Sequence, residues 1–73
     1  MKKRPVKQSH TVLLNDYEVA ERAAVSVATV RRWRLLGQGP RFLKLIASVR
    51  YRPEDVEAWL DSRPTGGEAV NEQ

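Results

Sequence analysis

The chain has 73 residues, a formal net charge of +4 and no cysteine. A domain of this length buries only about 60% of its unfolded surface, so we expect a thin core. Without cysteine, and with His10 as the sole histidine, the sequence excludes a disulfide framework, thiolate catalysis and a Cys/His zinc site. No apolar run reaches the roughly 18 residues of a membrane span, and no signal peptide is recognisable, so we expect a soluble cytoplasmic protein.

Positive charge is concentrated in the middle of the chain. Residues 25–52 contain seven cations and no carboxylate, whereas the residues after 52 are acidic overall. Such a block is typical of a surface that binds a polyanion, with a merely solvated basic face as the alternative. Residues 1–10 are basic with no periodicity, and residues 63–73 contain Pro64, Gly66 and Gly67, so both ends are predicted to be disordered tails. This leaves one folded domain over residues 11–62.

Two helices are predicted in the first half of that domain. Asn15 is a good N-cap, and Glu18 stands three residues later as in a capping box, so a helix should begin at Asp16. It should stop near Ala24, because Ser26 is a second N-cap signal. The second helix is predicted over residues 27–36.

Small and apolar residues follow the spacing of a helix-turn-helix. Counted from the first helical residue, the fifth must be small where the helices cross, the tenth must bury its side chain in the turn, and the fifteenth and eighteenth must hold the second helix on the first. The ninth residue, usually glycine, is Ala24, so we expect the turn to use a non-glycine conformation at some cost. The residues with this spacing are Val19, Ala20, Ala23, Val25, Val30 and Trp33.

A β-hairpin and a third helix are predicted to complete the domain. Residues 42–46 and 49–52 resemble two short strands around Ala47 and Ser48, with Arg41, Leu43 and Leu45 on one side and Phe42, Lys44 and Ile46 on the other. Pro53 suits the first position of a helix, which the acidic residues after it favour. We expect this helix to close the core, with Trp33 and Trp59 as core residues; base stacking is the alternative role for the two rings.

The second helix carries the residues best suited to read DNA. It should point Ser26, Val27, Ala28, Thr29, Arg31, Arg32 and Leu35 away from the core. A threonine can offer its hydroxyl and methyl groups to a base, and an arginine can donate two hydrogen bonds to guanine. The arginines could equally clamp phosphates without reading sequence.

Three stretches resemble the excisionase and AlpA-type family, small relatives of MerR-type winged helices. Residues 13–22 (LLNDYEVAER) are similar to the start of these proteins and residues 25–34 (VSVATVRRWR) to their recognition helix. Residues 39–42, 49–52 and 54–60 are similar to the family's hairpin, called the wing, and its closing helix. The resemblance implies a mainly α fold with a small β-hairpin, arranged as a winged helix-turn-helix. The DNA-binding residues would be Ser26, Val27, Ala28, Thr29, Arg31, Arg32, Arg34, Arg41, Lys44, Arg50 and Arg52.

The resemblance also implies partners and a role. Excisionases are recombination directionality factors of phages and integrative elements: several copies bind and bend double-stranded DNA and steer a tyrosine integrase toward excision. AlpA-type transcriptional regulators share the domain and remain the alternative. No further domain is recognisable after residue 62, which favours the architectural role, with a free monomer that assembles on the DNA of the nucleoid. We expect neither enzymatic activity nor a cofactor. The wing tip, Ile46-Ala47-Ser48, departs from the family's Gly- and Arg-rich pattern, so Ile46 could pack in the fold or touch a partner protein.

Overall fold

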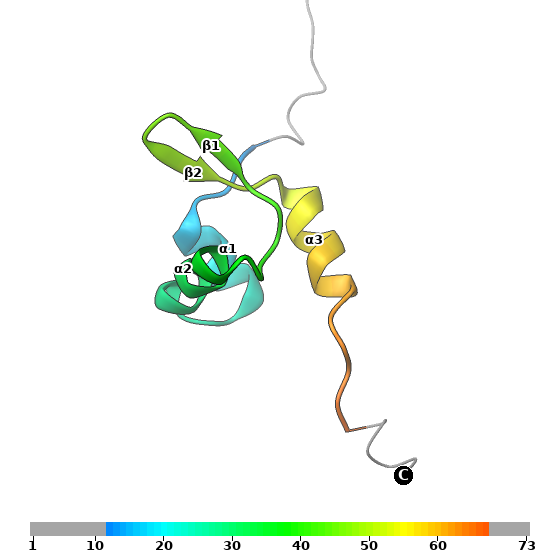
Figure 1. Ribbon diagram of the computed structural model, residues 1–73. Helices are drawn as coiled ribbons and strands as arrows, with labels where there is room; N and C mark the ends of the chain where they lie inside the picture. Colours follow the sequence, from blue (N-terminus) through cyan, green and yellow to red (C-terminus); the bar gives the residue numbers. More distant parts are fainter. Residues whose placement is uncertain (1–11, 68–73) are drawn as a thin grey trace, which may run out of the picture.

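The computed structural model describes residues 12–67, which form three helices and one hairpin (Figure 1). The predicted mainly α winged helix-turn-helix is confirmed. None of the helices in this part of the chain is long and apolar enough to cross a membrane. The tail predicted for residues 1–10 and the last six residues of the other tail lie outside the described residues. The elements are α1 (Asp16–Ala23), α2 (Val27–Leu36), β1 (Leu43–Leu45), β2 (Ser48–Arg50) and α3 (Pro53–Asp61).

The predicted capping box of α1 is present. The Asn15 side-chain oxygen accepts a hydrogen bond from the Glu18 backbone N–H at 2.9 Å, and the Asn15 N–H donates to a Glu18 carboxylate oxygen at 2.8 Å. These contacts satisfy two backbone donors at the helix start. They fix the position of Asp16, the first residue of α1.

The turn between α1 and α2 differs from our expectation. Ala24 takes the left-handed conformation that glycine usually supplies, with φ of 59°. Its N–H points back to the carbonyls of Ala20 and Glu21, and the Val25 N–H donates to the Ala20 carbonyl at 3.0 Å. Closure of α1 by these bonds holds the alanine in a conformation that is unfavourable for residues with a Cβ atom.

Replacing Ala24 by glycine is therefore expected to stabilise the protein by about 1 kcal/mol, because glycine adopts this conformation without steric cost. The matched variant Ala23→Gly, one residue earlier in α1, should lose about 1 kcal/mol through lower helix propensity. Urea unfolding of both variants beside the parent measures the two changes. An Ala24→Gly protein no more stable than the parent would contradict the strained turn.

The hairpin is shorter than predicted. β1 and β2 are antiparallel, with Leu43 opposite Arg50 and Leu45 opposite Ser48, so the connection is the two-residue turn Ile46-Ala47. The predicted alternation therefore ends at Leu45, and Ile46 lies in the turn rather than in a strand. The turn starts one residue earlier than predicted. Ile46 adopts a left-handed φ of 59°, the conformation that the first residue of a two-residue hairpin turn requires.

The core is built around a tyrosine rather than the tryptophans. Tyr51 is 1% exposed and is the largest fully buried side chain among residues 12–67. Trp33 and Trp59 are only partly buried: their ring centroids lie 4.7 Å apart at the edge of the core, and the Trp59 indole N–H donates to the Gln38 carbonyl. Trp33 packs against the buried cluster, as expected for a core residue, but both rings lie at its edge, where they cover each other in part. The buried cluster is Val19, Ala20, Val30, Tyr51 and Val56.

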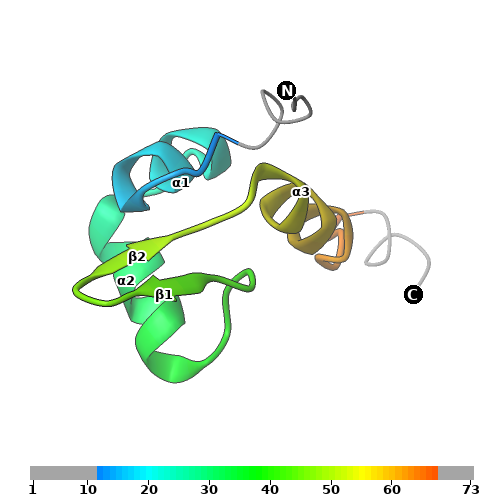
Figure 2. The ribbon, with the colours of Figure 1, turned by 90° about the horizontal axis from the view of Figure 1, so that it is seen from above.

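Tyr51 also connects the hairpin to the start of the domain. Its backbone pairs with Leu14 in an isolated antiparallel bridge, with two hydrogen bonds of 2.8 Å. The segment before α1 thus runs beside the end of β2. Seen from above, the hairpin lies over α2, and α3 lies beside the hairpin at the end away from the tip (Figure 2).

Candidate nucleic-acid interface

The N-terminal end of α2 is exposed and well capped. The Ser26 side chain accepts a hydrogen bond from the Thr29 backbone N–H at 3.1 Å, and the two hydroxyl oxygens lie 3.0 Å apart. Ser26 and Ala28 are exposed, as predicted, and Thr29 is half-buried. The methyl of Ala28 is short enough for the helix backbone to approach a groove floor closely.

Val27 does not point away from the core as predicted. It is half-buried and packs against the core cluster, because it lies one helical turn before the fully buried Val30. The apolar face of α2 therefore begins at its first residue. Ala28 and Arg32, one turn apart, lie on the exposed side.

The arginines of α2 differ in their contacts. Arg32 is exposed, and within residues 12–67 its side chain makes no ion pair. Arg31 is half-exposed: its Nε lies 3.1 Å from an Asp16 carboxylate oxygen, and its guanidinium stands 5.3 Å above the Tyr17 ring. Arg32 thus has the greater freedom to reach a ligand.

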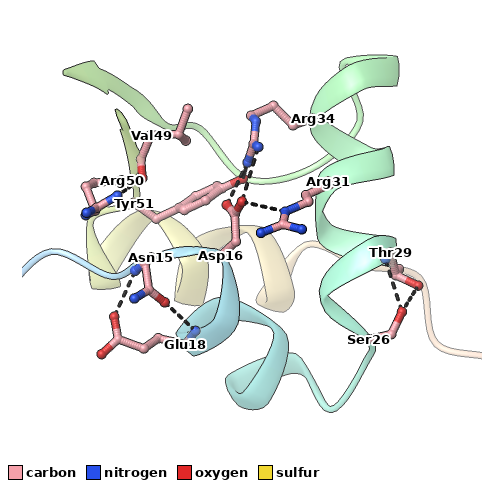
Figure 3. A network of polar contacts seen from close by, with 10 residues as sticks. All are labelled: Asn15, Asp16, Glu18, Ser26, Thr29, Arg31, Arg34, Val49, Arg50 and Tyr51. Atoms are coloured by element: carbon pink, nitrogen blue, oxygen red, sulfur yellow. Dashed lines mark hydrogen bonds and ion pairs between the residues drawn. The ribbon is translucent and has the colours of Figure 1, made fainter. Parts of the chain in front are cut away.

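Arg34 is engaged in a network that ties α2 to α1 and the hairpin. Its guanidinium donates to both Asp16 carboxylate oxygens, at 2.7 and 3.2 Å, and to the Tyr51 hydroxyl at 3.0 Å. It also lies 5.8 Å from the Phe42 ring centre. Figure 3 shows the Asp16 carboxylate between the two arginines, with the Tyr51 ring reaching toward it. Arg34 therefore holds the three elements that form the exposed basic face.

The charges in this network stabilise each other. The Asp16 side chain is only 14% exposed, and the hydrogen bond from Arg34 holds the pKa of its carboxyl below the ordinary value, against the opposing effect of burial. The same contact raises the pKa of Arg34. Both groups thus remain charged at neutral pH.

A cleft lies between α2 and the hairpin. Its walls carry apolar groups of Leu35, Phe42 and Val49 beside the cations of Arg31, Arg34 and Lys44. Lys44 is exposed, and its position opposite Val49 places it with Phe42 on the predicted face of β1. Recognition-helix and hairpin cations therefore border one groove.

The other hairpin cations are more dispersed than the predicted single set. Arg41 borders a cleft with Asp55 and Trp59 of α3. Arg52 is the N-cap residue of α3, 3.8 Å from Asp55. Arg50, half-buried, donates to the Val49 carbonyl at 2.7 Å. Only Lys44 and Arg50 lie within the strands themselves.

Two residues of the site escape the sequence reasoning. Asp16 has the ordinary position of an acidic residue in the first turn of a helix, and Tyr51 that of an apolar strand residue. Asp16 is 18 positions before Arg34 and Tyr51 is 17 positions after it, so no local sequence pattern predicts these two contacts. The one available signal is that a carboxylate next to a basic block needs a cationic partner when it is buried.

The comparisons with known proteins agree with this arrangement. The Helix-turn-helix domain family matches residues 13–64, which is more than half of the chain. No curated protein and no solved structure matches the chain. The match spans α1, the turn, α2, the hairpin and α3. The chain belongs to the Helix-turn-helix domain family, and its function is sequence-specific DNA binding.

Proposed function

We propose that the protein is an excisionase, a recombination directionality factor that binds and bends attachment-site DNA and steers a tyrosine integrase toward excision. The observation that carries the proposal is the groove between α2 and the hairpin, where one small domain offers two DNA-contacting elements with cations on both walls. The resemblance of residues 12–62 to excisionases supports the same role. The task is architectural, without catalysis or a cofactor, and it is performed on DNA in the cytoplasm.

The contacts are divided between reading and holding. The exposed N-terminal side of α2 enters the major groove, where Arg32 reads a base and Ser26, Ala28 and Thr29 approach the groove edges. Val27 contributes mainly by packing. Arg34 acts indirectly by fixing α2 against α1 and the hairpin, and Arg31 and the wing cations contact phosphates.

Replacing Arg32 by alanine should weaken specific binding and relax the preference at one base pair by roughly 1–3 kcal/mol. Lys44→Ala should instead weaken binding to all duplexes alike, because a phosphate contact carries no sequence information. Competition titrations with the specific duplex and a random duplex measure both effects. If Arg32→Ala loses the same affinity on both duplexes, Arg32 contacts only phosphates and does not read a base.

Assembly of several copies on DNA supplies the affinity that one small domain lacks. One recognition helix covers little DNA, so weak contacts between neighbours matter once the duplex holds them close together. Leu35 is 84% exposed at the border of the groove and is available for such a contact. Head-to-tail contacts of this kind can continue along the helix axis.

The proposal is tested in two steps. Sedimentation should find a monomer without DNA, and affinity per copy should rise on duplexes with one, two and three copies of a site selected from random sequence. Excision by the tyrosine integrase of the same genetic element should then require the protein. A stable free dimer, or excision that proceeds equally well without the protein, would instead indicate a transcriptional regulator of the AlpA type.

A further inference from the structure

The tip of the hairpin carries an apolar side chain in an unusual conformation. Ile46 is fully exposed, with a relative accessibility of 105%, the highest of the large apolar residues in the described part of the chain. Its φ of 59° is rare for a β-branched residue, and glycine is the usual occupant of this position in a two-residue turn. Neither burial in the fold nor turn geometry explains an isoleucine there, so the predicted packing alternative for Ile46 is wrong.

The surroundings of Ile46 indicate which kind of molecule meets it. Lys44 and Arg50 lie in the two strands that carry the tip, and residues 25–52 contain no carboxylate. The tip projects away from the acidic helix α3 (Figures 1 and 2). A positively charged hairpin of this kind is attracted to a polyanion, and repels a basic protein surface.

We propose that Ile46 is a wedge that enters the minor groove and partly unstacks one base step, which kinks the DNA. The inference rests on the proposed function, in that it assigns the bending step to one residue. Apolar side chains inserted between base steps bend duplexes toward the major groove. The tip consists of only two residues, and Ala47 beside Ile46 is small, which suits a groove about 6 Å wide.

The fold itself supports such an insertion. Arg31 of α2 and Lys44 of β1 both line the groove between the helix and the hairpin. A DNA backbone bound by these two cations would have the hairpin over the minor groove when α2 occupies the major groove. The bridge between Leu14 and Tyr51 anchors the base of the hairpin to the segment before α1. This pairing fixes the base of the hairpin relative to α1, so that the tip has a defined position when α2 is bound.

The test compares Ile46→Gly with Ile46→Met on a duplex that carries a single selected site. Glycine suits the left-handed turn and removes the wedge without endangering the fold, whereas methionine keeps an unbranched apolar wedge. The duplex carries end-to-end fluorophores for the bend and a 2-aminopurine at each candidate step for unstacking. We expect the parent and Ile46→Met to bend the duplex and to raise 2-aminopurine fluorescence at one step, and we expect Ile46→Gly to bind while losing both signals.

Each outcome separates the wedge from the proposed function. An unchanged bend and fluorescence signal in Ile46→Gly would overturn the wedge. If that variant bends DNA normally but loses cooperative binding or excision, the tip contacts a protein, the wedge is wrong and the excisionase proposal stands. If the parent shows the fluorescence signal but integrase needs no protein for excision, the wedge holds and the excisionase proposal fails.

Discussion

Raising the monovalent salt concentration from 50 to 200 mM is expected to weaken DNA binding by about five-hundredfold, because about five phosphate contacts each contribute roughly −0.9 to the logarithmic salt slope. Seven cations lie between residues 31 and 52, and Arg34 is committed to Asp16 and Tyr51, which leaves six for the DNA. Fluorescence anisotropy titrations at several salt concentrations measure the slope.

The same titrations contain their control. Lys44→Ala should make the slope shallower by about one unit, since it removes one phosphate contact. Glu57→Gln, on the face of α3 that pairs with Arg22, should leave the slope nearly unchanged. A parent slope shallower than about −2 would show that the basic block is merely solvated, since two contacts would then account for it.

Replacing Asp16 by asparagine is expected to destabilise the protein by about 2–3 kcal/mol, because the half-buried Arg34 loses its charged partner. The side chains of Arg34 and Asp16 are 22% and 14% exposed, so little water can replace the lost contact. Glu57→Gln breaks the surface pair with Arg22, whose side chains are about half exposed, and should cost under about 1 kcal/mol. Urea unfolding at pH 7 compares the two, and equal losses would contradict the special role of Asp16.

The pH dependence of stability provides a second measurement on the same carboxylate. Folding lowers the pKa of Asp16 from its ordinary value of 3.8, so the ionised carboxylate is more stable in the native state than in the unfolded chain. Its contribution is therefore complete above that value and is lost as the pH falls through the lower pKa of the folded protein. We expect the stability difference between the parent and Asp16→Asn to shrink in acid below pH 3.8. A difference that stays constant down to pH 2 would contradict this linkage.

Local patterns predict the helices well. The capping box fixes the start of α1, Ser26 and Gly37 bound α2, and Pro53 begins α3, because each signal acts within a few residues of the helix end it specifies. The order of the elements and the family resemblance follow from the same patterns. The existence of the second helix and of the hairpin was therefore predictable from the sequence.

Long-range contacts account for the errors. The predicted site treats Arg31, Arg32 and Arg34 alike. In the structure Asp16 of α1 pairs with Arg34 and partly buries it, whereas Arg32 remains exposed. The tryptophans cover each other because α2 and α3 meet there, and Val27 turns inward with Val30. Two left-handed residues, Ala24 and Ile46, have no sequence signal, since glycine is the usual marker of that conformation.

The bridge between Leu14 and Tyr51 has a consequence for how the protein folds. Contacts within α1 and α2 are local, but this pairing joins positions 37 residues apart, so its formation carries a high loop-closure cost and should come late. Because Tyr51 supplies both the largest core side chain and a hydrogen bond to Arg34, the helix pair is incomplete until the hairpin docks. During synthesis, the first two helices should therefore become stably folded only after residue 51 has left the ribosome. A chain truncated before that tyrosine should remain susceptible to proteases.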